Sequence, residues 1–487
     1  MLPFMSVSQA RPINRAKPAA QTVAWETILL ALLAIPLGIA LAALAWRSTL
    51  TAPINYNEGC NAYFVAAVLS GGPLYFPPEA LTTNNYPPLS FLLEAPLATL
   101  MGDAIFAGRL LAWLSFAAIA GLIGAIVHRL NRDRLAAMLA VMLFAGCMVI
   151  NYDIYVGMND PQMLAHAGML LGLWLLLRHG LTACAAVVMA AALFAKHNII
   201  ALPLSVALWL LLTDRRAALR FIATGIASGV AGLALCLIAY GHNLISSLLA
   251  PRQYVPVRAW RHAVEWMMPI ELPVLLAALA AVVDRKNRYT LLFTGYGLIA
   301  LLLAWAFAGG AGVNFNLMFD VVIAFSLAAG QLLACLRPQR SLRLWAIGAY
   351  AFAAVVSAGL VATKGQLLLR PWIASERARE AASLTAIRAV ASRPAPALCE
   401  NLAICYWAGK PLELDAFNFG QGVIAGTKQE RPVLQRIASG GYGAIELNVA
   451  TTEPSFLGPR IPAAVMERYR KSSIPSGPFE IYTEPHD

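Results

Sequence analysis

The chain has 487 residues, of which 59% are hydrophobic and only 13% are charged, and its net charge is +11. A soluble globular domain carries about 25% charged residues, so this composition excludes an ordinary soluble protein and indicates a membrane protein. The positive charge is explained by orientation in the membrane and by contact with anionic lipids. We therefore expect membrane lipids, and no nucleic acid, among the partners of this protein.

Hydropathy along the chain predicts a multi-pass α-helical membrane protein with about 11 spans. The spans are expected at residues 25–46, 105–127, 135–151, 161–177, 181–195, 199–213, 221–240, 270–283, 290–308, 317–336 and 344–362. Those at 181–195, 199–213 and 270–283 are short for a bilayer, which indicates tilted, broken or shielded helices. Together they define a transmembrane domain at residues 25–363, preceded by a segment at 1–24 without a cleavage-site pattern.

Basic residues occupy every second turn between these spans. The groups are Arg11, Arg15 and Lys17; Arg129, Arg132 and Arg134; Arg178; Arg215, Arg216 and Arg220; Arg285, Lys286 and Arg288; and Arg337, Arg340 and Arg343. If each run crosses once, all of them lie on one side, and positively charged loops stay in the cytoplasm. The pattern predicts a cytoplasmic N-terminus and a C-terminus on the outer face of the membrane.

Two long stretches are expected outside the bilayer, both on the outer face. The first outer loop, 47–104, contains short amphipathic runs that would lie along the membrane surface as juxtamembrane helices. In the second stretch, 364–487, helix-like and strand-like runs alternate, which predicts a small α/β soluble domain. Cys399 and Cys405 lie within it, and their separation permits, but does not require, a disulfide in an oxidising compartment.

The first candidate for chemistry is Glu58, in NYNEGCNAYF (55–64), directly after the first span. A carboxylate at the membrane edge is costly unless it is solvated, paired or functional. Glu58 is therefore a helix-end carboxylate in headgroup water, a general base, or a group that orients a nucleophile. Further along the loop, Tyr86 precedes Pro87 and Pro88, where stiffening of a turn is the simpler explanation.

The second candidate is Asp160, in YVGMNDPQML (155–164), which opens a later span. Asn159, Asp160 and Pro161 have the pattern of a helix start, with a capping side chain followed by proline. Capping therefore explains Asp160 as well as chemistry does. Asp153 is a nearby rival for the same functional role.

Basic side chains on the expected outer face are candidates for phosphate binding. Lys196 and His197, in LFAKHNIIALPL (193–204), interrupt a hydrophobic hairpin. The ammonium group would reach headgroups or bind a phosphate, and the imidazole would be a neutral hydrogen-bonding or a titrating group. Arg252, Arg258 and Arg261 also lie outside, against the charge rule, so they indicate headgroup contact or an anionic ligand.

A later outer segment, FAGGAGVNFNLMFD (307–320), places Asn314, Asn316 and Asp320 at the entrance of a span. Its glycines would let the backbone approach a ligand, or would form only a turn. All of these candidates map to one face of the membrane. Carboxylates for an acceptor and cations for a departing phosphate suit a transfer reaction there.

The motifs in this order resemble those of the GT-C type of integral-membrane glycosyltransferases. The likeness is strongest to the bacterial branch related to protein mannosyltransferases and to the aminoarabinose transferases of lipid A. The matching pieces are NEG (57–59), GGPLY (71–75), YPPL (86–89), NDPQ (159–162), KHN (196–198), GGAGVNFNLMFD (309–320) and PALCENLAICYWAGKPLELDAFNFGQ (396–421). The family has an acidic residue or an acidic pair near Glu58, whereas Asn57 precedes it here.

The resemblance implies an inverting glycosyltransferase of a bacterial inner (plasma) membrane, with its C-terminus in the periplasm. It would use a polyprenyl-phosphate sugar donor at a cavity facing the outer leaflet. Glu58 would deprotonate or orient the hydroxyl of a glycan, lipid or protein acceptor, and Asp160 would assist. The leaving phosphate would be stabilised by Lys196 and His197 with Arg252, Arg258 or Arg261, and the cavity would include Tyr86, Asn159, Asn314 and Asn316. No cofactor is required, although some relatives use a divalent metal. The alternative is a polytopic transporter or lipid flippase, which would place ionisable residues near the bilayer midplane.

Overall fold

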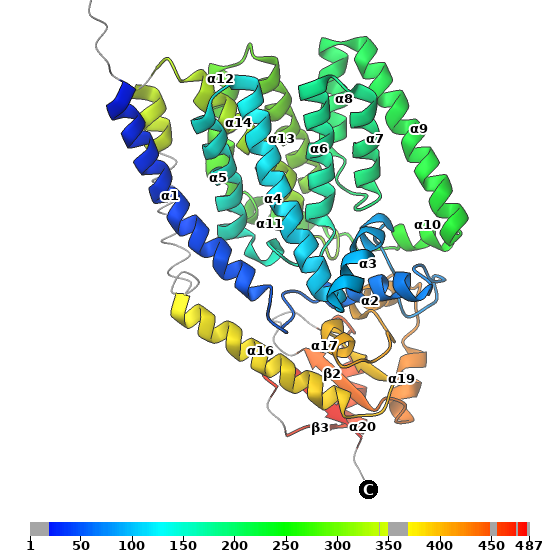
Figure 1. Ribbon diagram of the computed structural model, residues 1–487. Coiled ribbons are helices and arrows are strands. Elements are labelled where there is room, and N and C mark those ends of the chain that lie inside the picture. Colours follow the sequence, from blue (N-terminus) through cyan, green and yellow to red (C-terminus); the bar gives the residue numbers. More distant parts are fainter. Residues whose placement is uncertain (1–18, 340, 349–368, 449–454, 474–475, 485–487) are drawn as a thin grey trace, which may run out of the picture.

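The computed structural model describes residues 19–339, 341–348, 369–448, 455–473 and 476–484 (Figure 1). It is mostly helical, and its long helices form a bundle above the C-terminal unit in the view of Figure 1. They are α1 (Ala19–Arg47), α4 (Ala104–Asn131), α5 (Arg134–Asn151), α6 (Gln162–His179), α9 (Arg215–Tyr240), α13 (Arg288–Phe307) and α14 (Phe319–Cys335). Within the described residues, seven helical stretches are long and apolar enough to cross a membrane: Leu30–Arg47, Ala104–Asn131, Arg134–Asn151, Arg215–Tyr240, Pro256–Val283, Arg288–Phe307 and Phe315–Cys335. The predicted multi-pass helical class is therefore confirmed.

Three helices of the bundle are short, as the sequence predicts: α7 (Thr182–Leu193), α8 (Ala201–Thr213) and α12 (Glu271–Val283). Each is shielded by longer neighbours, because α7 packs against α6 and α9, α8 against α9 and α13, and α12 against α14. The core is most continuous at α14, where every residue from Phe319 to Leu333 is buried. The predicted span at 344–362 falls mainly outside the described residues.

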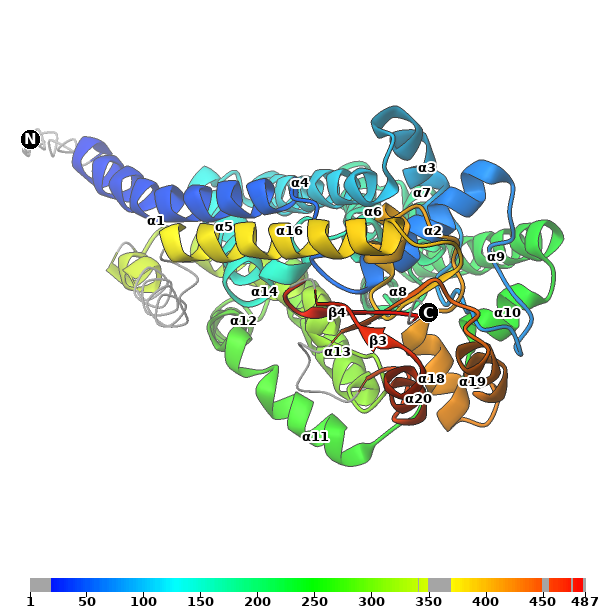
Figure 2. The same cartoon turned by 90° about the horizontal axis from the view of Figure 1, so that it is seen from below.

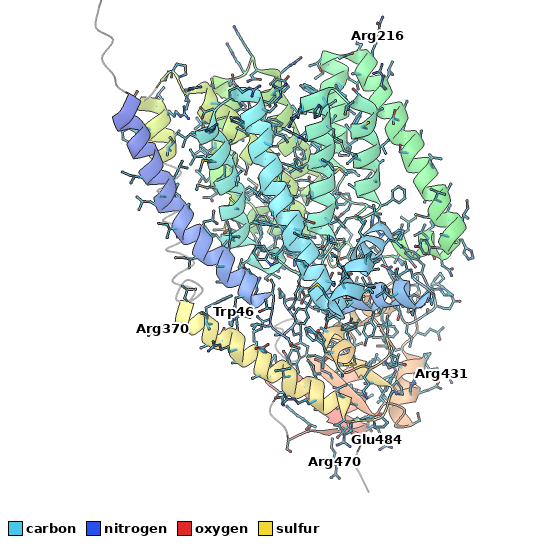
Figure 3. All side chains as sticks on the ribbon, in the orientation of Figure 1. Trp46, Arg216, Arg370, Arg431, Arg470 and Glu484 are labelled. Atoms are coloured by element: carbon cyan, nitrogen blue, oxygen red, sulfur yellow. A yellow bond between two sulfur atoms is a disulfide. The ribbon has the colours of Figure 1, made fainter. Side chains whose placement is uncertain are left out.

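The two ends of the bundle differ in composition. The turns α4–α5, α6–α7, α8–α9 and α12–α13 carry arginines and lie together at the top of Figure 1, and Figure 3 marks this end by Arg216. We call it the basic end. The opposite end carries the C-terminal sheet and is called the sheet end. The alternation of charged and uncharged turns in the sequence thus corresponds to two ends of one helix bundle.

Short helices cover the sheet end, as expected of juxtamembrane segments. They are α2 (Asn57–Ser70), α3 (Leu89–Met101), α10 (Asn243–Leu248) and α11 (Pro256–Glu265), with the 3-10 turns η1 (Asp153–Tyr155), η2 (Met268–Ile270) and η3 (Phe315–Met318). Helix α11 is amphipathic and buries no residue, and it leaves Val257 79% and Trp260 75% exposed. Such an apolar face suits a helix that lies in the membrane interface.

The C-terminal region forms a small α/β unit (Figure 2). In its described part, β1 (Ala397–Cys399), β2 (Ala444–Asn448), β3 (Arg470–Lys471) and β4 (Phe479–Thr483) form one sheet of order β1-β2-β4-β3. Strands β1 and β2 are parallel and the other pairs antiparallel. The accompanying helices are α16 (Leu369–Ala391), α17 (Leu402–Trp407), α18 (Ala416–Ile424), α19 (Arg431–Ala438) and α20 (Arg460–Arg468). The predicted C-terminal α/β fold is confirmed.

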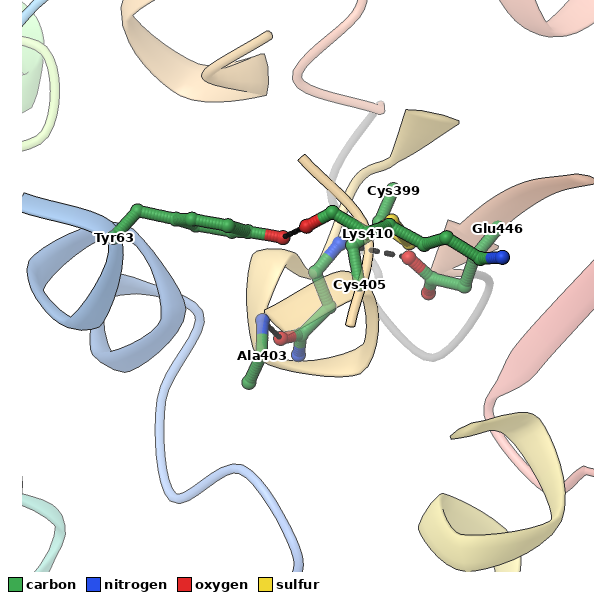
Figure 4. Close-up of a disulfide and its surroundings, with 7 residues drawn as sticks. Tyr63, Cys399, Ala403, Cys405, Lys410 and Glu446 are labelled. Carbon is green, nitrogen blue, oxygen red and sulfur yellow. Dashed lines mark hydrogen bonds between the residues drawn. A yellow bond between two sulfur atoms is a disulfide. The ribbon is translucent and has the colours of Figure 1, made fainter. Parts of the chain in front are cut away.

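A disulfide closes the turn between β1 and α17. It joins Cys399 to Cys405, whose Cα atoms are 5.9 Å apart. Figure 4 shows Glu446 of β2 beside it. The carboxylate of Glu446 is fully buried and accepts from the main-chain N of Asn401 at 2.8 Å, while its Oε1 has no hydrogen-bond partner among the described residues. The disulfide therefore borders a poorly solvated carboxyl group.

The C-terminal unit is tightly docked on the sheet end. A Cβ at Gly59 of α2 would lie 2.1 Å from the main-chain N of Ala403, so only glycine lets α17 approach this closely. The Trp407 indole donates to Asp103 at 2.9 Å, and the Tyr63 hydroxyl donates to the carbonyl of Lys410 at 2.7 Å. The motif NEG (57–59) therefore contributes a close packing contact as well as a carboxylate.

Candidate active site

Glu58 lies in the first turn of α2 and is completely buried. Arg109 of α4 binds it through two hydrogen bonds, Nε to Oε1 and Nη2 to Oε2, each 2.8 Å long. The main-chain N–H groups of Asn159 and Ile54 donate to the same two oxygens, at 3.1 Å and 2.7 Å. Each oxygen of Glu58 thus accepts two hydrogen bonds, which suits a carboxylate that holds the neighbouring side chain and main chain in place.

Asn159 links this ion pair to the start of α6. Its Nδ2 donates to Glu94 of α3 at 3.1 Å, and its carbonyl accepts from Asn61 of α2 at 2.9 Å. A Cβ at Gly108 of α4 would lie 2.1 Å from the Asn159 side chain, so glycine makes room for it. Three helices therefore hold the peptide that leads into Asp160.

Asp160 forms a buried pair with Lys196. The Lys196 Nζ lies 3.0 Å from Asp160 Oδ1, and the two residues are 4% and 8% exposed. Oδ1 also accepts from the main-chain N of Gln162 at 2.8 Å, so Asp160 caps the start of α6 as well. The cap and the ion pair are compatible because a carboxylate has about four acceptor positions.

Tyr86 completes this group. Its hydroxyl is 3.4 Å from Asp160 Oδ2, and the Lys196 ammonium lies 4.7 Å from the centre of its ring. Burial, with Asp160 adding to it, raises the pKa of Tyr86 well above its usual range, so the phenol stays neutral and donates. The main-chain N of Leu89 donates to the carbonyl of Phe194 at 3.0 Å, which brings YPPL next to KHN.

A chain of polar side chains continues from Asp160 into the bundle. Asn316 donates to Gln162 at 3.2 Å, and the Gln162 Nε2 lies 2.8 Å from the Nε2 of His166. The Nδ1 of His166 is 3.5 Å from Asp320, which also accepts a short hydrogen bond from Tyr296. Polar side chains therefore extend from the site into the bundle between α6, α13 and α14.

Arg252 lies on another wall of the site, where it contacts the C-terminal unit. Its Nη2 donates to Asn418 of α18 at 3.1 Å, and its guanidinium lies 5.3 Å from the ring centre of Phe417. A partly enclosed cavity runs from Arg252 and these α18 residues to Tyr86 and α2. Arg252 thus borders the same cavity as the Tyr86 side of the Asp160–Lys196 pair.

Several predicted residues lie apart from this group. Arg258 and Arg261 are on α11, which packs on α13, and Arg261 forms an exposed pair with Glu265 at 3.6 Å. Asn314 is exposed and caps η3, and Asp153 pairs with Arg47 at 2.9 Å. His197 is exposed beside the buried Lys196. Among the residues that the structure describes, no contact joins these side chains to Asp160.

Sequence reasoning missed Arg109, Glu94, His166, Asp415 and Asn418. Arg109 carried a usable signal, because a basic residue inside a hydrophobic span needs a buried partner. His166 carried the same signal, because it lies inside the span predicted at 161–177. Glu94, Asp415 and Asn418 had none, since their surroundings come from distant parts of the chain. Within the described ranges, no group of three or more His, Cys, Asp or Glu side chains is placed to hold a metal ion.

Comparison with known proteins identifies the fold. No family model and no curated protein matches the sequence. Two crystal structures of ArnT from Cupriavidus metallidurans are similar at 13% sequence identity. The one bound to undecaprenyl phosphate has a TM-score of 0.62 over 95% of this chain and 100% of that chain, and the apo one has 0.63 over 96% and 100%. The chain therefore has the fold of ArnT along nearly its whole length, and the fold that its motifs implied is confirmed.

Proposed function

We propose that this protein is an inverting glycosyltransferase that moves a sugar from a polyprenyl-phosphate donor to an acceptor on the outer face of the membrane. The observation that carries the proposal is the buried Asp160–Lys196 pair, 3.0 Å apart, beside the Tyr86 hydroxyl. It combines a proton acceptor with a cation for phosphate. It lies in a fold shared with a protein that was crystallised with undecaprenyl phosphate.

In the proposed reaction, the acceptor hydroxyl attacks the anomeric carbon of the donor sugar. A new bond forms between that carbon and the acceptor oxygen, while the bond to the phosphate oxygen breaks and its electron pair leaves with the phosphate. Asp160 takes the hydroxyl proton as general base. The lipid phosphate changes from a diester with one negative charge to a monoester with up to two, and Lys196 stabilises the added charge.

Glu58 takes the orienting role in this proposal. Its two oxygens accept four hydrogen bonds, including both from Arg109 and one from the main-chain N of Asn159. These bonds use all of the about four acceptor positions of a carboxylate. Among the described residues, the Oδ2 atom of Asp160 accepts only from the Tyr86 hydroxyl at 3.4 Å, so it has room to accept a substrate proton. Through Asn159, Glu58 supports the peptide that carries Asp160, so the catalytic base and the orienting carboxylate are different residues.

Lys196 and Arg252 are the cations that we assign to the donor phosphate, with His197 next to them. Arg258 and Arg261 stay predictions, because they lie on α11. No metal is required in this scheme, since the ammonium and guanidinium groups can neutralise a lipid monophosphate. If a divalent metal takes part, a chelator should abolish turnover, and adding the ion back should restore it.

Two observations support the proposed orientation, in which the sheet end faces the periplasm of a bacterial inner membrane. The arginine-rich turns gather at the opposite end, which the positive-inside rule places in the cytoplasm. The Cys399–Cys405 disulfide lies at the sheet end, and disulfides persist in oxidising compartments such as the periplasm. The N-terminus would then be cytoplasmic.

The test is turnover of radiolabelled polyprenyl-phosphate sugars by the full-length protein in bilayers, with Asp160→Asn beside the wild type. We expect the wild type to consume donor in the presence of a cell-envelope extract as acceptor. Asp160→Asn should lose about 10²–10⁴-fold in rate, the usual contribution of a general base. Donor turnover that is unchanged in Asp160→Asn would refute Asp160 as the base. If the wild type neither binds nor turns over any donor, the proposal that this protein is a transferase is refuted.

A transporter or lipid flippase is the second candidate, and one observation favours it. The group His166, Asp320 and Tyr296 lies buried between helices of the bundle, as ionisable residues on transport paths do. Such a protein would carry a labelled polyprenyl phosphate across a liposome membrane without breaking a bond, and Asp320→Asn would slow this movement. Donor cleavage that depends on Asp160 would decide for the transferase.

A further inference from the structure

The cavity at the sheet end has one wall from the bundle side and one from the C-terminal unit. Residues 57, 60, 61 and 64 line it, and this spacing of three and four residues forms one face of α2. Opposite them lie Asp415, Phe417 and Asn418 of the α18 region, and Tyr86 belongs to the same lining. A ligand in this cavity would therefore be one side chain away from Asp160.

Asn61 is the most informative residue of this lining. It is 1% exposed, and its Nδ2 donates to the carbonyl of Asn159 at 2.9 Å. Its Oδ1 is buried and has no hydrogen-bond partner among the described residues. A buried acceptor without a partner costs about 1–3 kcal/mol, so it needs a water or a ligand that brings a hydrogen-bond donor.

The other charged groups of the cavity also favour a neutral hydrogen-bond donor over an anion. The carboxyl groups of Asp415 and Glu400 are acceptors, and both lie in the lining. The guanidinium of Arg252, the cation of this lining, already donates to Asn418 at 3.1 Å. In the proposed reaction Arg252 faces the donor phosphate, so a second anion in this cavity would meet two acidic side chains and no further cation of the lining. Both oxygens of Glu400 and both oxygens of Asp415 already accept hydrogen bonds from neighbouring residues. The acceptor left without a partner among the described residues, and so open to a neutral ligand with a hydroxyl donor, is Asn61 Oδ1.

The aromatic rings of Tyr56 and Phe417 belong to the lining, and both pack against Phe456. Tyr56 lies 6.1 Å from Phe417 and 4.9 Å from Phe456, and Phe417 lies 5.4 Å from Phe456, measured between ring centres. Rigid aromatic faces of this kind pack well against flat apolar surfaces, and a sugar ring presents such a surface on its C–H side. The cavity thus combines aromatic rings with an unpartnered acceptor for a hydroxyl group, Asn61 Oδ1.

From these contacts we infer that the cavity between α2 and α18 is an acceptor subsite that takes a neutral carbohydrate, and that the attacking group is a sugar hydroxyl and not a phosphate. The inference rests on the proposed function and specifies its acceptor. The hydroxyl oxygen forms the bond to the donor's anomeric carbon, its proton passes to Asp160, and the donor's lipid phosphate leaves with the electron pair. A hydroxyl needs this base, whereas a phosphate acceptor is already ionised at neutral pH.

The test is saturation-transfer NMR with the full-length protein in nanodiscs that contain undecaprenyl phosphate, which occupies the donor phosphate site. Methyl glucoside is the neutral probe and glucose 1-phosphate the anionic one. Two variants remove one feature each: Asn61→Leu removes the acceptor, and Phe417→Leu removes the ring. Matched controls are Gln435→Leu on the exposed side of α19 and Trp345→Leu near the basic end, which is 78% exposed. Thermal unfolding identifies any variant that fails to fold, and Phe417→Leu then decides, because it leaves the Asn61–Asn159 hydrogen bond in place.

We expect saturation transfer to methyl glucoside with the wild type and both controls, and at least a fivefold weaker signal with Asn61→Leu and Phe417→Leu. Absence of binding, equal binding of glucose 1-phosphate, or variants that bind like the wild type would each overturn the subsite. Donor binding, measured separately with undecaprenyl phosphate, keeps the two proposals apart. If the wild type does not bind undecaprenyl phosphate, the proposed transferase is refuted. If it turns over donor but does not bind methyl glucoside, only the acceptor subsite is refuted.

Discussion

Arg109 binds Glu58 through two hydrogen bonds of 2.8 Å, and the two residues are 1% and 0% exposed. The guanidinium also donates to the carbonyls of Ser48, Leu50 and Ala52, at 3.2, 2.7 and 2.7 Å. One arginine in a membrane helix therefore holds the chain between α1 and α2, and through Glu58 it reaches Asn159. Through this ion pair, Glu58 of the NEG motif links the segment between α1 and α2 to Asn159, the residue before the proposed base Asp160.

Removing one partner of this pair should destabilise the protein strongly. We expect Arg109→Met to cost about 3–5 kcal/mol, because it leaves a buried carboxylate without its cation. Glu58→Gln should behave similarly, and the double variant Glu58→Gln/Arg109→Met should recover part of the loss. Thermal unfolding in detergent measures this. A Glu58→Gln protein with unchanged stability and no activity would instead assign the role of base to Glu58.

Lys196 should discriminate a phosphorylated lipid from a neutral one. We expect Lys196→Met to weaken binding of undecaprenyl phosphate about tenfold or more, since a hydrogen bond to a charged group contributes about 1.5–3 kcal/mol. Undecaprenol, which lacks the phosphate, is the matched ligand, and its affinity should stay the same. Lys196→Arg should retain part of the preference. An equal loss for both lipids would mean that Lys196 supports the fold and not the phosphate.

The disulfide should stabilise the C-terminal unit. Closing the short loop between Cys399 and Cys405 contributes about 2 kcal/mol by the chain-entropy relation, so Cys399→Ser/Cys405→Ser should lower the unfolding temperature. Dithiothreitol should have the same effect on the wild type and none on the double variant. Cys184→Ser, at an exposed free cysteine, is the control. An unfolding temperature that does not respond to reductant would show that the bond does not form.

Glu446 should make the C-terminal unit less stable at alkaline pH. Burial raises the pKa of this carboxyl to about 8, and the neighbouring Glu400 contributes. The folded state then binds more protons than the unfolded state between about pH 4.5 and 8, so the free energy of unfolding falls as the pH rises through this window.

The matched variant is Glu446→Gln, which cannot ionise. Hydrogen exchange of β1 and β2 in the full chain should match the wild type near pH 5 and be slower than the wild type near pH 8.5. A wild type whose exchange, corrected for the intrinsic rate, stays level from pH 5 to 8.5 would show that Glu446 is charged throughout.

The sequence alone determined the membrane class, the order of the helices, the separation of basic turns from candidate residues, and the C-terminal α/β fold. These properties depend on hydropathy, charge and periodicity, which neighbouring residues set locally. The short helices at 182–193 and 201–213 were likewise predictable, because length is read from the chain itself. The motif order also carried the fold class, which the likeness to ArnT confirms.

Only the tertiary structure decided which groups meet. Glu58 pairs with Arg109, Asp160 with Lys196, and Arg252 with Asn418, which is 166 residues away. It also separated Arg258 and Arg261 on α11 from the Asp160 group, although the sequence placed them on the same face. The physical reason is that the predicted topology places a residue only along the membrane normal. Contact between two residues on the same face depends on how helices that are distant in the sequence pack around one another.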